Sequence, residues 1–183
     1  MSFKLKNGDK IELDIVDLTS EGSGVGKIEK MAIFVPETVT GDKVLVKINK
    51  IKKNYALGEV VELIEPSQDR VQPKCSFYDR CGGCQLQHIS YQSQLEIKTK
   101  QVYDALERIG KIKDVKVHPT IGMKEPYRYR NKGEFPVGME NGQVSIGCFK
   151  RKSHDVVNVD SCIIQSEISE RIIEEVRRYM NEY

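Results

Sequence analysis

At 183 residues the chain is long enough for one large domain or two small ones, each with its own core. Hydrophobic residues make up 39% and charged residues 31%, and no stretch approaches the roughly 18 consecutive apolar residues that a membrane span needs. The first residues also lack the apolar core of a secretory signal. We therefore expect a cytoplasmic, monomeric protein that makes no membrane contact.

The formal net charge is only +2, but the charges are unevenly distributed. Residues 1–64 contain ten lysines and ten acidic residues, whereas residues 111–153 contain ten lysines and arginines against four acidic residues. Clustered basic charge can bind phosphate even when the whole chain is nearly neutral. The alternative is an ordinary solvated basic face.

The first third of the chain is typical of short strands. Residues 10–18 alternate polar and apolar side chains, and apolar runs follow at residues 33–35, 44–51 and 58–64. Turn signals lie between them, at residues 20–27 and at Gly41-Asp42. Five short strands without a helix predict a small closed barrel of the oligonucleotide-binding kind over residues 1–64.

The turn that contains Gly22, Gly24 and Gly26 superficially resembles a nucleotide-binding loop. Such a loop must open a helix, whose first amides hold the phosphate. The residues after Lys27 are strand-like instead, so we reject this interpretation.

Residues 65–74 contain two prolines in a polar run and are interpreted as a linker. A helix is predicted from Ser90 to Gly110, and its apolar stripe is expected to be core. Strands are predicted over residues 115–160, with a hairpin turn at Asn141-Gly142. A last helix is predicted from Ser166 to the final residue, where no stop signal is found, so we expect the chain to be truncated.

Three cysteines, Cys75, Cys81 and Cys84, are spaced C-x5-C-x2-C, with two glycines inside the second pair. The cytosol keeps thiols reduced, so metal binding is favoured over disulfides for these cysteines. Thiols two residues apart can hold one soft metal centre from a single turn, and the glycines let backbone N–H groups face the sulfurs. A catalytic thiol pair is the less favoured alternative.

A fourth ligand must come from Cys148 or Cys162. Cys148 lies in an alternating strand, where a lone cysteine is usually a small buried hydrophobe. Cys162 lies at a strand-to-helix junction, where a loop can bend its side chain toward a site, so we favour Cys162. The spacing by itself does not separate zinc from an iron–sulfur cluster, because both favour four thiolates.

Residues 75–98, with their Cys-Gly-Gly-Cys-Gln-Leu-Gln-His core, closely resemble the cluster motif of bacterial RNA uracil-5-methyltransferases. Residues 22–27, 34–36 and 41–42 resemble the TRAM domain of that family, a small RNA-binding barrel. Residues 129–132 and 153–162 also fit the family pattern.

This resemblance implies a [4Fe-4S] cluster as cofactor, held by Cys75, Cys81, Cys84 and Cys162. It also implies methyl transfer from S-adenosylmethionine to carbon 5 of a uridine, in 23S rRNA rather than tRNA. In the family a cysteine thiolate adds to carbon 6 and a base removes the carbon-5 proton. Those groups belong to a C-terminal domain that we do not find here, so we expect this chain by itself to be inactive, with no catalytic residues of its own.

RNA contacts are expected from two groups of cations. Arg128, Arg130 and Lys132 are expected to share one face of a strand, where they could follow a phosphate backbone. Five lysines surround the fourth strand of the barrel, namely Lys43, Lys47, Lys50, Lys52 and Lys53.

The fold class expected is mainly β with α/β additions. It comprises a TRAM barrel at residues 1–64, the linker at 65–74, and an iron–sulfur central domain with antiparallel strands and two helices at 75–183. The alternative function is a stand-alone iron–sulfur RNA-binding module. A radical methylthiotransferase is disfavoured because its C-x3-C-x2-C signature is absent.

Overall fold

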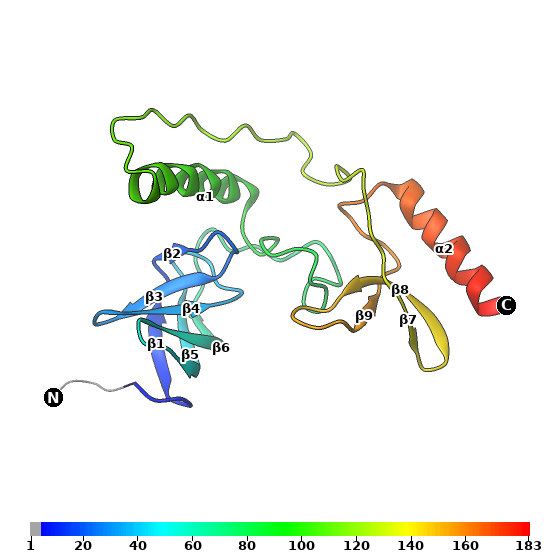
Figure 1. Ribbon diagram of the computed structural model, residues 1–183, viewed down its shortest axis with the longest axis horizontal. Coiled ribbons are helices and arrows are strands. Elements are labelled where there is room, and N and C mark those ends of the chain that lie inside the picture. Colours follow the sequence, from blue (N-terminus) through cyan, green and yellow to red (C-terminus); the bar gives the residue numbers. More distant parts are fainter. Residues whose placement is uncertain (1–4) are drawn as a thin grey trace. The chain divides into compact units, whose positions relative to one another are not determined.

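A computed structural model of the chain describes residues 5–183 (Figure 1). The chain forms two compact units. The first comprises the chain up to Gln72 together with His88–Thr120, and the second comprises Pro73–Gln87 and Ile121–Tyr183. The segment that carries the first three cysteines is therefore an excursion from the first unit into the second.

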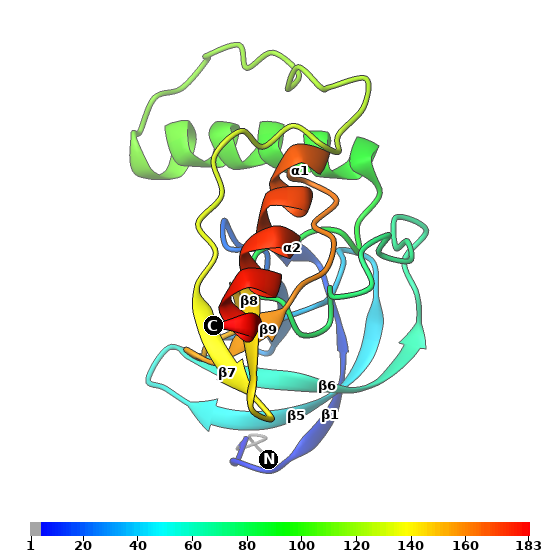
Figure 2. The same cartoon turned by 90° about the vertical axis from the view of Figure 1, so that its right-hand side faces the viewer.

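The first unit contains a six-stranded sheet in the order β1-β5-β6-β4-β3-β2. Its strands are β1 (Lys10–Asp14), β2 (Asp17–Leu18), β3 (Gly24–Ile28), β4 (Met31–Val35), β5 (Lys43–Ile51) and β6 (Tyr55–Glu65). Antiparallel pairing joins all neighbours except β4 and β6, which are parallel. Figure 2 shows the long β5 and β6 arrows beside β1.

The sheet closes on itself because the expected first strand is bent into two halves. β1 pairs with β5, and β2 pairs with β3 at the opposite end of the strand order. At the bend, the Ile15 amide donates to the Asp42 carbonyl and the Val16 amide donates to the Val25 carbonyl, both at 2.9 Å. The barrel predicted from the strand pattern is thus confirmed.

Alternating side chains of four strands fill the barrel. The best buried include Ile33, Val35, Val44 and Val46, each with no exposed surface. The residues after the glycine turn form strand β3 and not the helix that a nucleotide-binding loop would need. A Cβ on Gly24 would lie 1.9 Å from the Thr38 hydroxyl oxygen. Glycine at this position lets β3 approach the barrel interior closely.

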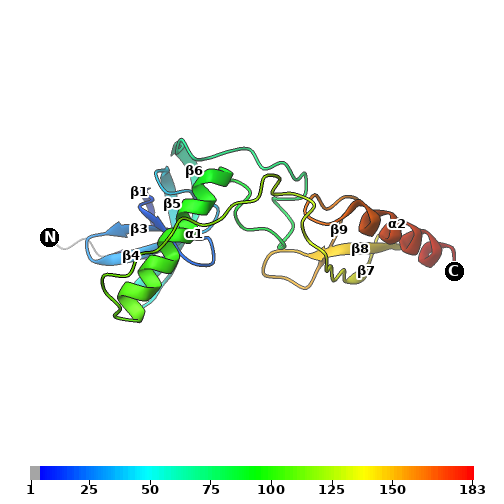
Figure 3. The ribbon, with the colours of Figure 1, turned by 90° about the horizontal axis from the view of Figure 1, so that it is seen from above.

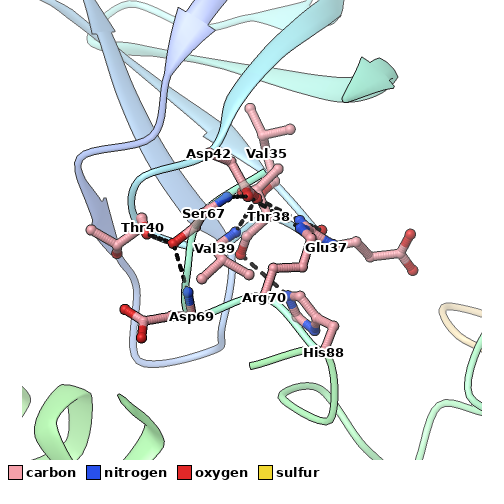
Figure 4. Close-up of polar contacts among 10 residues, drawn as sticks. All are labelled: Val35, Glu37, Thr38, Val39, Thr40, Asp42, Ser67, Asp69, Arg70 and His88. Atoms are coloured by element: carbon pink, nitrogen blue, oxygen red, sulfur yellow. Dashed lines mark hydrogen bonds and ion pairs between the residues drawn. The ribbon is translucent and has the colours of Figure 1, made fainter. Parts of the chain in front are cut away.

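A polar network, drawn in Figure 4, surrounds the buried Asp42 at the turn between β4 and β5. The fully buried Asp42 carboxylate accepts hydrogen bonds from the Val39 amide (2.6 Å), the Ser67 amide (2.9 Å) and Arg70 Nε (3.1 Å), and Arg70 Nη2 also reaches it. Burial by itself would raise the pKa of Asp42, but the hydrogen bonds from Arg70, Ser67 and Val39 outweigh it and lower that pKa.

The same network ties down both ends of the cysteine excursion. Arg70 forms an antiparallel bridge with Ile89, and the Ser90 amide donates to the Asp69 carbonyl at 2.8 Å. His88 is buried, with Nε2 at 3.2 Å from the Thr38 carbonyl oxygen. Burial lowers the pKa of His88, so the neutral ring is the form that this packing favours.

Helix α1 (Tyr91–Asp104) follows directly and continues as a π-helical turn over Ala105–Ile109. The Ser90 hydroxyl accepts from the Ser93 amide, which confirms the predicted N-cap. The apolar stripe expected to be core is only partly covered: Leu95 and Leu106 are half-buried, whereas Val102 is 51% and Ile109 is 82% exposed.

The second unit contains a three-stranded antiparallel sheet, β7 (Val137–Glu140), β8 (Gln143–Phe149) and β9 (Val156–Asn158). The predicted Asn141-Gly142 turn joins β7 to β8, with both residues at positive φ. Helix α2 (Glu167–Glu182) is capped by Ser166 and lies beside β8 (Figure 3), where Arg177 Nη2 donates to the Ile146 carbonyl at 3.1 Å.

Strands predicted between residues 115 and 136 are absent from this part of the described chain. Residues 111–136 contain neither a helix nor a strand, apart from a single bridge between Arg130 and Gln165. Polar–apolar alternation alone could not identify this segment as irregular, because a strand also needs a partner for its backbone groups.

Among residues 5–183, no helix combines the length and apolar character needed to cross a bilayer.

Replacing Asp42 with alanine is expected to cost about 3–5 kcal/mol, because Arg70 and two backbone amides are then left without their acceptor. Urea unfolding followed by circular dichroism measures this cost. The control is Lys43→Gln, which removes an exposed ion pair with Glu12 and should cost no more than about 1 kcal/mol. Equal costs for the two variants would contradict the role given to Asp42.

The pH dependence of stability follows from the same carboxylate. Because the pKa of Asp42 is lower in the folded state than its ordinary value of 3.8, its contribution is complete above that value. The contribution then disappears as the pH falls through the lower, folded-state pKa. Asp42→Asn is expected to flatten this acid limb of the stability profile.

Candidate metal centre

The first three cysteines lie in a compact loop over residues 75–84. Two turns shape the loop: the Tyr78 amide donates to the Cys75 carbonyl at 3.1 Å, and the Cys81 amide donates to the Phe77 carbonyl at 2.8 Å. Tyr78 is 5% exposed, and its hydroxyl donates to the Gln85 carbonyl at 2.9 Å. The buried Tyr78 side chain therefore links the start of the loop to the residue that follows Cys84.

The two glycines between Cys81 and Cys84 have separate roles. The Gly82 amide donates to the Phe149 carbonyl at 2.9 Å, and a Cβ at Gly82 would lie 2.9 Å from that same oxygen. The Gly83 amide donates to Cys81 Sγ at 3.3 Å. The N–H group expected to face a sulfur is thus found at Gly83, whereas the close backbone approach at Gly82 is to Phe149.

All five cysteines of the chain are free, half-buried and in the second unit. Burial raises the pKa of Cys75 and of Cys84, and neighbouring thiols add to the increase. In both cases the neighbours include Cys81 and Cys162. Cys162, far along the sequence, is thus within electrostatic range of the loop cysteines.

Cys148 also belongs to this group of thiols. It lies in β8, as expected, and forms a hydrogen bond with Cys81. This hydrogen bond, together with the Gly83 amide and the charge of Arg151, lowers the pKa of Cys81 to about 6, and the same bond raises the pKa of Cys148. The Cys81 and Cys148 thiols are therefore close enough to interact directly.

The segment that carries Cys162 is fixed by a charged pair. Glu170 on α2 accepts from the Cys162 amide and the Ser161 hydroxyl, both at 2.9 Å. Arg128 forms an ion pair with Glu170 and also donates to the Cys162 carbonyl at 3.2 Å. These contacts set the position of the Cys162 backbone from two other segments of the chain.

Within residues 5–183, no three Cys, His, Asp or Glu side chains are arranged like the ligands of one metal ion. The five thiols therefore share a region without converging on a single point. The iron–sulfur centre expected from the sequence, and its four proposed ligands, remain predictions.

The cations expected to bind RNA are placed differently from one another. Arg128 has positive φ and is engaged with Glu170, so it does not share a strand face with Arg130 and Lys132 as expected. Arg130, Lys132 and Glu134 line an open depression, where Lys132 pairs with Glu134 at 2.9 Å.

The lysines around β5 also divide into two groups. Lys43 pairs with Glu12 at 3.7 Å and Lys47 pairs with Glu59 at 3.5 Å. Lys50, Lys52 and Lys53 are exposed near the β5–β6 turn, and no ion pair engages them within residues 5–183. Among these five lysines, the last three are therefore the ones whose charge no carboxylate balances in the described part of the chain.

Two charged residues important for this site were not singled out from the sequence, Glu170 and Arg151. Glu170 belongs to a helix whose charged residues all resemble solvent-facing ones in sequence. Arg151 lies in a basic run, and nothing in that run indicates that its side chain contacts the cysteine loop. The Arg128–Glu170 pair and the contacts of Arg151 with the loop join segments distant in sequence, so local spacing carries no signal of them.

Comparison with known proteins finds similarity along nearly the whole chain. Residues 4–61 match the model of the TRAM domain. A protein of Halalkalibacterium halodurans named an uncharacterized RNA methyltransferase is 46% identical over 97% of this chain, and one of Caldanaerobacter subterraneus is 48% identical over 98%. The chain spans 39% of the length of each of these relatives.

A solved structure is also similar, that of a Pyrococcus abyssi tRNA (uracil-54, C5)-methyltransferase in complex with S-adenosyl-L-homocysteine. It has a TM-score of 0.58 and 25% sequence identity, and the match covers 93% of this chain and 37% of that one. Residues 4–61 of this chain are therefore a TRAM domain, and the chain as a whole is similar to RNA methyltransferases.

Proposed function

We propose that this chain is the RNA-binding and cluster-binding part of an S-adenosylmethionine-dependent RNA uracil-5-methyltransferase that acts on ribosomal or transfer RNA. The observation that carries the proposal is similarity along nearly the whole chain, both to named RNA methyltransferases and to a uracil-C5 methyltransferase structure. The TRAM domain supplies the barrel for binding RNA.

The proposed cofactor is a [4Fe-4S] cluster held by Cys75, Cys81, Cys84 and Cys162. A cubane takes one thiolate per iron, so its four ligands surround a volume and do not meet at one point. The four thiols proposed as ligands are half-buried in the second unit, and Cys75 and Cys84 interact electrostatically with Cys81 and Cys162.

The cluster has a structural role in this proposal, because methyl transfer from S-adenosylmethionine to carbon 5 requires no electron. Bound iron would join the loop at residues 75–84 to the Cys162 segment, which Arg128 and Glu170 already position. We propose that the protein is cytoplasmic, since the cytoplasm keeps thiols reduced. We also propose that it is a monomer.

The methyl donor belongs to the longer protein in this proposal. The sheets of the described residues are antiparallel apart from the β4–β6 pair, and no strand–glycine turn–helix unit follows any strand in residues 5–183. Such a unit is the usual site for a nucleotide-like cofactor. We therefore expect these residues to bind RNA and the cluster without catalysing methylation by themselves.

Anaerobically purified protein is expected to contain iron and sulfide in equal amounts, about four of each per chain, with the visible absorption of an iron–sulfur cluster. Serine in place of Cys75, Cys81, Cys84 or Cys162 should each reduce both contents, because one iron is then without its protein ligand. The matched control is Cys148→Ser, which should retain the full complement.

Two outcomes would contradict this assignment. Zinc without iron in the purified protein would overturn the cofactor. Loss of iron in Cys148→Ser together with full retention in Cys162→Ser would instead reverse the choice of fourth ligand.

RNA binding is expected to depend on the lysines near the β5–β6 turn. The double variant Lys52→Gln/Lys53→Gln should weaken binding of single-stranded RNA and reduce the slope of log affinity against log salt by about 0.7 for each phosphate that is no longer neutralised. Lys43→Gln/Lys47→Gln should have less effect, because carboxylates already pair with these lysines. Fluorescence anisotropy over a salt series measures both, and equal slopes in the two variants would argue against this surface.

A further inference from the structure

Arg151, in the turn between β8 and β9, makes an unusual set of contacts with the cysteine loop. Its guanidinium donates to three backbone carbonyls there: Nε to Cys81 at 3.3 Å, and Nη2 to Tyr78 at 3.1 Å and to Cys84 at 3.2 Å. Two of these carbonyls belong to proposed cluster ligands. One side chain therefore contacts the loop at three points along its length.

The guanidinium also stacks on the aromatic ring that organises the loop. Its central carbon is 4.7 Å from the centroid of the Tyr78 ring, within the range of a cation–π interaction. Tyr78 is in turn bonded through its hydroxyl to the Gln85 carbonyl. Arg151 thus covers the face of a buried side chain that spans the loop.

The backbone around Arg151 is fixed against the same loop. Lys150 forms an antiparallel bridge with Cys81, and the Arg151 amide donates to the Arg80 carbonyl at 3.4 Å. The Gly82 amide donates to Phe149 on the other side of this bridge. The backbone that carries the guanidinium is therefore fixed both by these loop contacts and by the β8–β9 hairpin, where the Lys150 amide donates to the Asp155 carbonyl at 2.9 Å.

We propose that Arg151 is a positioning residue, which orders the cysteine loop before the cluster binds and slows the release of the cluster afterwards. This inference rests on the cluster of the proposed function. A planar guanidinium presents several N–H donors in a fixed fork, so it can satisfy three carbonyls at once, whereas a lysine ammonium is a single point of charge.

When the loop carbonyls accept hydrogen bonds from Arg151, the loop backbone is held in a conformation in which the Gly83 amide donates to Cys81 Sγ. Hydrogen bonds of this kind support thiolate ligands. The positive charge of Arg151 adds an attraction for the negative charge that thiolate ligands bring together. Removing Arg151 would therefore make the loop less ordered and remove a positive charge that offsets the negative charge of the thiolate ligands.

The first experiment measures iron release to a chelator from the anaerobically purified 183-residue chain. Arg151→Met is expected to release iron about tenfold faster than the unsubstituted chain, the lower end of the effect of removing an outer hydrogen-bond partner of a metal site. Arg151→Lys, which keeps the charge but not the fork, should be intermediate. The control Lys152→Gln removes a neighbouring exposed charge and should release iron at the unsubstituted rate.

The second experiment uses cluster-free protein and follows trypsin cleavage after Arg80, inside the loop. Arg151→Met is expected to be cut there several-fold faster than the unsubstituted chain, while circular dichroism shows that both remain folded. Cleavage at an unchanged rate would overturn the claim that Arg151 orders the loop.

The two measurements separate this inference from the proposed function. If the unsubstituted chain holds iron and sulfide, and Arg151→Met and Arg151→Lys release iron no faster, the role of Arg151 is overturned while the cluster stands. If the unsubstituted chain never binds iron, the cluster and any part of Arg151 in retaining it are both overturned. The trypsin assay then decides the remaining claim about loop order.

Discussion

The buried Asp42 carboxylate is the group on which the arrangement of the first unit depends. It joins the turn after β4 to Ser67 and Arg70, and Arg70 in turn pairs with Ile89. The chain leaves the barrel and returns to it between these points. A charged pair reinforced by backbone donors is suited to this position, because breaking it would leave a buried charge unpaired. That energetic cost keeps the segment at Arg70 close to the segment at Ile89.

The second unit combines a small apolar core with several polar contacts between its segments. Its buried apolar residues are few, namely Tyr78, Val144, Ile146, Val157, Val159 and Ile164. Arg151, Arg128 and Glu170 supply hydrogen bonds that join the cysteine segments to the sheet and to α2. Small units with a limited core commonly rely on a metal centre for part of their stability, which is the role proposed here for the cluster.

Much of the local structure could be predicted because it depends on local chemistry. Ser90 and Ser166 cap the two helices since their hydroxyls accept the first free amides, and Asn141-Gly142 forms the hairpin turn since both residues tolerate positive φ. The barrel followed from alternation over short strands. The same alternation was misleading between residues 115 and 136, where neighbouring segments offer no partner strand.

The sequence by itself led to the prediction of a metal centre, from three closely spaced cysteines and two glycines, and its resemblance to a known family led to the prediction that the cofactor is a [4Fe-4S] cluster. Only the tertiary structure decided that Arg128 supports the Cys162 segment through Glu170, that Cys148 contacts Cys81, and that Arg151 spans the loop carbonyls. Arg128 and Cys162 are 34 positions apart, and Arg151 and Cys84 are 67 positions apart. Side chains distant in sequence meet only after the sheet and its register are formed, so no spacing rule within one segment could reveal them.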